Sequence, residues 1–116
     1  MNILYKDKNI EKQCKDYKIA IKKYNKLVAE KLHGVINFIE DADNLMDVKS
    51  IPNYRLHPLK GDKKGEYAID LGKKLGFRLI IVPLDPKGER WDTTDETTIY
   101  NSTSIIIAME VTNHYE

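Results

Sequence analysis

The sequence has little that would point to a disulfide-linked protein, a cysteine-ligated metal site or a membrane protein. Its single cysteine, Cys14, excludes an internal disulfide and a cysteine cluster for a metal. Its longest apolar run, Leu79 to Leu84, is far shorter than the ~20 residues that cross a bilayer. The opening residues lack a basic segment followed by a long apolar stretch, so no secretory signal is expected. These absences favour a cytoplasmic protein.

The usual signatures of metal and nucleotide sites are also missing. The three histidines, His33, His57 and His114, are scattered and lack the spacing of a zinc site. Neither glycine-rich phosphate motif, GxGxxG or GxxxxGK[ST], occurs. We therefore expect no metal and no cofactor. His33 is expected to be structural, and Cys14, which falls on an apolar stripe, to be a small buried hydrophobe.

Charge is distributed unevenly although the formal net charge is only +1. Residues 49–80 carry eight Lys and Arg against three acids, a local charge of +5. Residues 81–116 carry two basic residues against seven acids, a local charge of −5. A basic middle in a near-neutral chain is typical either of a phosphate-facing surface or of a solvated loop, and charge alone does not decide between them.

The first half of the chain has the period of helices. A short apolar opening, residues 2–5, predicts a strand, and apolar residues then recur at steps of three and four from Ile10 to Ile39. The first stripe allows either one helix or two with a break near Asp16. Asn44 is expected to cap a short helical turn that follows.

The second half changes to the period of strands. In residues 66–71, Tyr67, Ile69 and Leu71 alternate with polar neighbours, which predicts a half-buried strand. Two more strands are predicted at residues 77–82, ended by Pro83, and at residues 104–112. In the first of these, Arg78 lies on the face opposite Phe77. The 116 residues thus predict one domain, 1–116, of the α+β class: two N-terminal helices packed on a small antiparallel sheet of about four strands. A long acidic hairpin loop is expected at about 83–103.

One constellation carries candidate chemistry. It comprises His57, Lys60, Lys63 and Lys64 before one strand, Arg78 within the next, and His114 and Tyr115 after the last. These groups could cleave RNA without a metal, because one can take the 2′-OH proton, a cation can stabilise the phosphorane and another group can protonate the leaving oxygen. The same groups could merely hold phosphate.

The run "RLHPLKGDKKGEYAIDL" (residues 55–71), followed by "GFRLIIV" and "AMEVTNHYE", resembles the HigB toxins of the RelE/ParE superfamily. The opening "NILYKDKNIEKQCKDY" is similar to the plasmid-maintenance killer branch of that superfamily. The resemblance implies a toxin of a type II toxin–antitoxin module with two helices on a small antiparallel sheet. It implies an endoribonuclease that enters the ribosomal A site, cuts mRNA with the 2′-OH as nucleophile and inhibits translation. It also implies a HigA-like helix-turn-helix antitoxin as partner.

By this resemblance, His57 and Lys60 match the family's H-x-L-K run and serve as general base or phosphate anchor. Arg78 matches the strand Arg that neutralises the scissile phosphate, and Tyr115 and His114 complete the catalytic set. The residues expected to bind RNA phosphates are Arg55, Lys63, Lys64, Lys73 and Lys74. The sequence departs from the family in its His-Tyr-Glu tail, in "GFR" in place of "GNWR", and in the length of residues 83–103.

Two alternatives remain at this stage. One is a ParE-like toxin that inhibits DNA gyrase by binding, without enzymatic activity. The other is an inactive binding relative. The grouping of His57, Lys60 and Arg78 favours the nuclease, because gyrase binding gives no reason to place an acid–base group beside a phosphate-binding Arg. The general base is left open: an ordinary Lys pKa of ~10.4 leaves Lys60 protonated at neutral pH unless neighbouring cations lower it.

Overall fold

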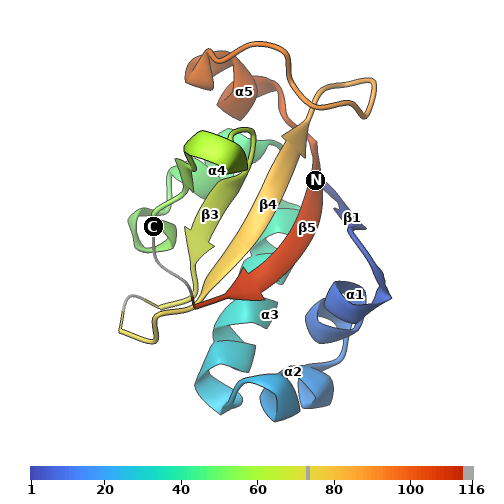
Figure 1. Cartoon of the computed structure of the whole chain (residues 1–116), viewed down its shortest axis with the longest axis vertical. Helices are drawn as coiled ribbons and strands as arrows, with labels where there is room; N and C mark the ends of the chain where they lie inside the picture. Colours follow the sequence, from blue (N-terminus) through green and yellow to red (C-terminus); the bar gives the residue numbers. More distant parts are fainter. Residues whose placement is uncertain (73, 114–116) are drawn as a thin grey trace.

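A computed structural model describes residues 1–72 and 74–113 of the chain. Figure 1 shows an α+β fold in which the N-terminal helices lie against one side of a twisted sheet. The helices are α1 (Lys8–Lys15), α2 (Tyr17–Lys23), α3 (Lys26–Asp41), α4 (Leu45–Lys49) and α5 (Glu96–Ser102), with short 3₁₀ turns η1 (Pro52–Tyr54) and η2 (Gly61–Lys63). The strands are β1 (Asn2–Tyr5), β2 (His57–Pro58), β3 (Tyr67–Asp70), β4 (Arg78–Leu84) and β5 (Ile105–Thr112).

Polar side chains set the helix boundaries. Asp7 accepts a hydrogen bond from the backbone N–H of Ile10 and so caps the start of α1. Asp16 ends α1 with an extended backbone and accepts from two backbone N–H groups of α2. The first apolar stripe is therefore two helices with a break at Asp16. Asn44 caps α4, as the sequence predicts.

The sheet differs from the antiparallel sheet of about four strands expected from the sequence. Within the described residues it has five strands in the order β1-β5-β4-β3-β2. The strands β2 to β5 form the expected antiparallel meander, but β1 pairs parallel to β5, with Asn2 opposite Ile105. Residues 2–5 predict a strand, but alternation within so short a segment carries no information about its partner or its direction.

The connection between β4 and β5 also differs from the expected loop. Strand β4 continues through Pro83 to Leu84 instead of ending before the proline. It can do so because β3 pairs with β4 only as far as Ile81, so one side of β4 has no ladder partner at Pro83. Farther along, the stretch predicted to be loop contains helix α5.

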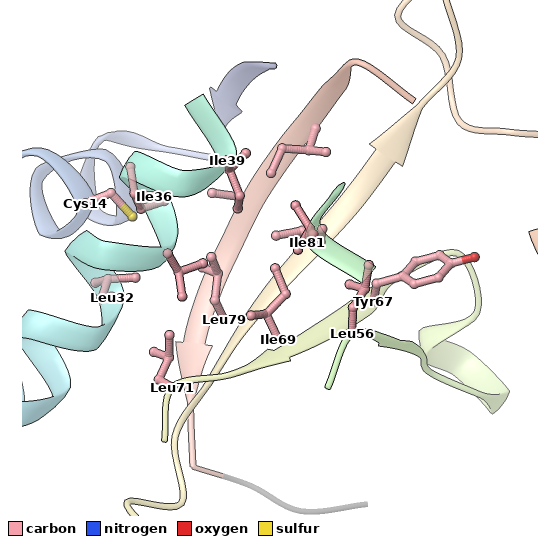
Figure 2. Packing of buried hydrophobic residues seen from close by; sticks show 14 of the residues in the cluster. Cys14, Leu32, Ile36, Ile39, Leu56, Tyr67, Ile69, Leu71, Leu79 and Ile81 are labelled. Atoms are coloured by element: carbon pink, nitrogen blue, oxygen red, sulfur yellow. The ribbon is translucent and has the colours of Figure 1, made fainter. Parts of the chain in front are cut away.

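The core lies between the helices and one face of the sheet (Figure 2). Leu32 and Ile39 of α3 are fully buried in the same cluster as Leu79 and Ile81 of β4. We call this side of the sheet the helix face. The opposite side, called the open face here, carries a small second cluster of Leu59, Ala68, Ile80 and Met109, to which no helix contributes. The pleat thus separates an apolar face from a face available for polar groups.

Cys14 and His33 are structural residues, as the sequence predicts. The Cys14 side chain is only 3% exposed, and His33 hydrogen-bonds through Nε2 to the carbonyl oxygen of Gln13 at 2.9 Å. No helix among the described residues is long and apolar enough to span a membrane.

Burial raises the pKa of the Cys14 thiol to about 12. At pH 8 the thiolate fraction in the folded protein is then about 10⁻⁴, whereas an ordinary thiol is substantially ionised. We expect Cys14 to react with an aromatic disulfide reagent at least ~100-fold more slowly in native protein than in urea-unfolded protein. Absorbance of the released thiolate measures both rates, and equal rates would show that Cys14 is not buried.

Candidate functional site

Polar residues of strands β2, β3 and β4 lie on the open face. Asp70 lies opposite Arg78 in the pairing of β3 with β4, and Ala68 lies opposite His57 in the pairing of β2 with β3. Because side chains two residues apart share a face, His57, Asp70 and Arg78 all project to the side away from the helices. The face expected for Arg78 from the sequence is confirmed.

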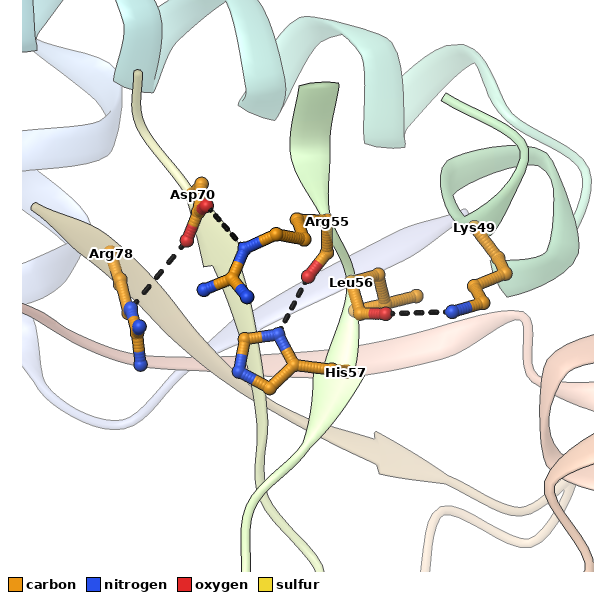
Figure 3. Close-up of polar contacts among 6 residues, drawn as sticks. All are labelled: Lys49, Arg55, Leu56, His57, Asp70 and Arg78. Carbon is orange, nitrogen blue, oxygen red and sulfur yellow. Dashed lines mark hydrogen bonds and ion pairs between the residues drawn. The ribbon is translucent and has the colours of Figure 1, made fainter. Parts of the chain in front are cut away.

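The carboxylate of Asp70 is the centre of this group (Figure 3). One of its oxygens lies 2.8 Å from Nε of Arg55 and the other 3.5 Å from Nε of Arg78. The side chains of Asp70 and Arg78 are 9% and 13% exposed, whereas that of Arg55 is 55% exposed. Two guanidinium groups therefore share one carboxylate, and the three side chains together keep a net charge of +1.

Arg55 owes its position to an unusual backbone conformation. It follows the 3₁₀ turn η1 and has φ 47° and ψ 44°, the left-handed region that few residues other than glycine adopt. Its side chain reaches Asp70 while its own carbonyl oxygen faces His57. The hydrogen bond to Asp70 and its negative charge raise the pKa of the Arg55 guanidinium, so Arg55 stays charged at every physiological pH.

The ring of His57 is oriented by the same backbone. Its Nδ1 lies 2.6 Å from the carbonyl oxygen of Arg55. Since a carbonyl oxygen can only accept, Nδ1 is the donor, and in the neutral ring Nε2 carries the lone pair. The segment is held from the other side by Lys49, whose Nζ donates to the carbonyl oxygen of Leu56 at 3.0 Å. His57 thus presents a potential proton acceptor on the open face.

The lysines of the predicted set do not all join this group. Lys60 and Lys64 line a pocket together with Pro58 and Tyr67, which face each other on the helix face. Lys63, in contrast, is near the open face, where its Nζ lies 4.0 Å from a carboxylate oxygen of Glu110 on β5. Lys60 and Lys64 thus line a pocket to which neither His57 nor Arg78 contributes.

The remaining predicted residues lie elsewhere. Lys74 is exposed in the turn between β3 and β4. Lys73, His114 and Tyr115 lie outside the described residues, so their predicted roles in phosphate binding and catalysis stay predictions. In the described ranges, no group of three or more His, Cys, Asp or Glu side chains could hold a metal ion.

Two residues of interest were not selected from the sequence. Asp70 was assigned to the polar side of its strand but not to the site, although it shares that side with Arg78 across a Gly-flanked turn, which is a usable signal for an ion pair. Arg90 lines the pocket with Lys60 and Lys64 and comes from the segment read as an acidic loop. Nothing in the local sequence of Arg90 indicates that contact.

Comparison with known proteins bears on the fold. No family model matches the sequence, and no curated protein matches it. Among solved structures, a YoeB/ParE toxin from Agrobacterium tumefaciens superposes with a TM-score of 0.52 at 14% identity, covering 99% of this chain and 100% of that chain. A YoeB–YefM complex from Staphylococcus aureus gives 0.53 at 18% identity, covering 99% and 98%. The chain therefore has the α+β fold of these toxin structures, and neither of the two is named HigB.

We expect Asp70→Ala to destabilise the protein by about 3 kcal/mol, because it leaves the nearly buried guanidinium of Arg78 without its carboxylate. Arg55→Ala should cost at most about 1 kcal/mol, because the Arg55 side chain is largely exposed. Urea unfolding followed by circular dichroism measures both changes. Equal losses for the two variants would show that Asp70 does not anchor Arg78.

Proposed function

We infer that the chain is a toxin of the RelE/ParE superfamily that cleaves RNA and acts within a type II toxin–antitoxin module. The two toxin structures with the same fold support the class. The observation that carries the activity is the open-face group in which Asp70 holds Arg55 and Arg78 beside His57. We refer to these four residues as the Asp70 group.

The reaction we propose is transesterification by the RNA itself. The 2′-oxygen attacks the adjacent phosphorus, the bond from phosphorus to the 5′-oxygen breaks, and the products are a 2′,3′-cyclic phosphate and a 5′-hydroxyl end. His57 accepts the 2′-OH proton through Nε2, because Nδ1 is already engaged as a donor to the Arg55 carbonyl oxygen. Lys60 is the weaker candidate for this step because it lines a pocket to which no residue of the Asp70 group contributes.

The arginines supply charge stabilisation. During the attack, negative charge grows on the non-bridging phosphate oxygens, and a preoriented cation stabilises it more than it stabilises the substrate. Arg78, only 13% exposed and held by Asp70, is the preoriented cation. Arg55, which is more exposed, suits the binding of a neighbouring phosphate. Asp70 is a positioning residue and does not touch the substrate.

The proton that the leaving 5′-oxygen requires would come from His114 or Tyr115, as the resemblance to the HigB toxins implies. For the same reason, we propose that the substrate is mRNA bound in the ribosomal A site. Translation would then stop because the message is cut. The resemblance also assigns Lys63 and Lys74 to phosphate binding around the site.

We further propose a helix-turn-helix antitoxin of the HigA kind as partner. One of the two structures of the same fold is that of a YoeB–YefM complex, which supports a partner protein for this chain too. An antitoxin that covers the Asp70 group would keep RNA from Arg78. Gyrase inhibition remains the alternative function, because the name of the Agrobacterium tumefaciens structure includes ParE.

Induction of this chain alone should stop growth, with loss of translation and with mRNA fragments that carry 5′-hydroxyl ends. Arg78→Ala should lower the cleavage rate by about 10²–10³-fold, because the developing phosphate charge loses its preoriented cation. His57→Ala should lower it by about 10²–10⁴-fold. Lys31→Ala, on the exposed side of α3, is the matched control and should stay toxic.

Cleavage is measured by mapping 5′ ends in cells and by rate assays on translating ribosomes. Unchanged toxicity of Arg78→Ala would refute the nuclease. An arrest of DNA replication that comes first, with intact mRNA, would establish gyrase inhibition in its place.

A further inference from the structure

A pocket lies at the end of the sheet, away from the Asp70 group. It opens between the loop around η2 and the segment that leads into α5, and its volume is about 560 Å³. Sites for small ligands are usually ~300–1,000 Å³ in size. Neither the fold nor the proposed cleavage reaction uses this pocket.

The apolar part of the pocket includes two aromatic side chains held in fixed positions. Trp91 donates from Nε1 to the hydroxyl of the buried residue Thr103 at 3.0 Å, so its indole orientation is set from inside the protein. Tyr67 packs edge-on against Tyr100, with ring centroids 5.9 Å apart. Pro58, Leu59, Pro83 and Ile99 add to the apolar surface. A planar, partly apolar ligand could lie against these side chains without reordering them.

Cations line the pocket on the side of η2. Lys60 and Lys64 come from the η2 loop, and Arg90 comes from the opposite segment. A Cβ added at Gly65, where φ is +93°, would lie 3.1 Å from a guanidinium nitrogen of Arg90, so the glycine lets Arg90 approach the lysine loop closely. None of the three forms an ion pair with another described residue. Their charges are therefore available to an anionic ligand.

Acids line the pocket on the side of α5. Asp92 and Glu96 both contribute to it. One oxygen of Glu96 accepts a hydrogen bond from the Tyr100 hydroxyl at 3.1 Å, which leaves the other oxygen for a ligand. Burial, with a contribution from Glu96, raises the pKa of Tyr67, so its hydroxyl remains protonated. The pocket is thus lined by three cations, two carboxylates and two aromatic rings.

We propose that this pocket binds a nucleotide. The phosphate lies among Lys60, Lys64 and Arg90, the base lies against Trp91, and the carboxylate of Asp92 accepts hydrogen bonds from the edge of the base. A base with two adjacent donors fits Asp92 best, because both oxygens of this carboxylate can accept. Guanine offers such a pair, its ring N–H and its amino group, whereas uracil offers no amino group. We therefore expect a guanine nucleotide to bind more tightly than a uracil nucleotide.

The proposal does not depend on the proposed function, because no residue of the Asp70 group lines this pocket. The ligand could be a free nucleotide or one nucleotide of an RNA strand, since the recognised chemistry is the same. An RNA strand would gain affinity from further phosphate contacts, whereas a free nucleotide would not.

The probe is the intrinsic fluorescence of Trp91, the only tryptophan of the chain. Titration with guanosine monophosphate should change the fluorescence in a saturable way, at least ~10-fold more tightly than with uridine monophosphate. Lys60→Ala and Arg90→Ala should each weaken binding by about 10-fold, because each removes a charge-assisted contact to phosphate. Lys31→Ala should bind as wild type does.

Further measurements distinguish RNA from a free nucleotide as the ligand, and test the nucleotide site separately from the nuclease proposal. Tighter binding of a guanine-containing tetranucleotide than of the mononucleotide identifies RNA as the source of the ligand, and equal binding identifies a free nucleotide. Arg78→Ala should bind guanosine monophosphate normally, so unchanged cleavage together with normal binding in this variant would refute the nuclease proposal alone. No saturable change, an equal response to inorganic phosphate, or unchanged affinity in both Lys60→Ala and Arg90→Ala would overturn the nucleotide site.

Discussion

The sharing of one nearly buried carboxylate by two arginines is the constraint on which the open face depends. Asp70 can hold Arg78 only because β3 and β4 pair in the register that sets them opposite each other. The same register buries Ile69 against the helices, since neighbours along a strand point to opposite faces. A slip of one residue would move the carboxylate into the core and the isoleucine into water, so the apolar core enforces the polar group.

The left-handed backbone conformation of Arg55 lets its side chain and its own carbonyl group contact two different partners. Its guanidinium pairs with Asp70, and its carbonyl oxygen accepts from His57. The orientation of the imidazole and the position of the carboxylate are therefore coupled through a single residue. Backbone conformations of this kind persist only where surrounding contacts compensate for their strain, and here Asp70 and the Lys49 contact to Leu56 supply them.

Much of the fold could be predicted from the sequence, because buried apolar residues recur with the period of a helix or of a strand. The cap at Asn44 and the face of Arg78 follow from local patterns, whereas the pattern left open whether the first helical stretch breaks at Asp16. Features that depend on partners distant in the sequence could not be predicted from local patterns. The parallel pairing of β1 and the helix α5 within a polar connection both need the three-dimensional arrangement.

The same division applies to the candidate site. His57, from the run of residues 55–71, and Arg78 were both selected as candidates for RNA cleavage, and the structure brings both to the open face. Lys60 belongs to the same run but lies beyond the end of β2, at the start of the η2 loop that lines the pocket, where strand alternation no longer fixes the direction of a side chain. Asp70 was missed because its importance lies in its two partners, one of them fifteen residues away.

The parallel pairing of β1 with β5 has a consequence for how the chain folds during its synthesis. Asn2 is made well before its partner Ile105, because β5 comes after all the other described strands in chain order. The helices can form locally on the emerging chain, but the sheet cannot close until β5 has left the ribosome, because its central pairings require that strand. A chain whose synthesis stops early would lack the strand that joins β1 to β4. Only a chain that already includes β5 can therefore assemble the complete sheet.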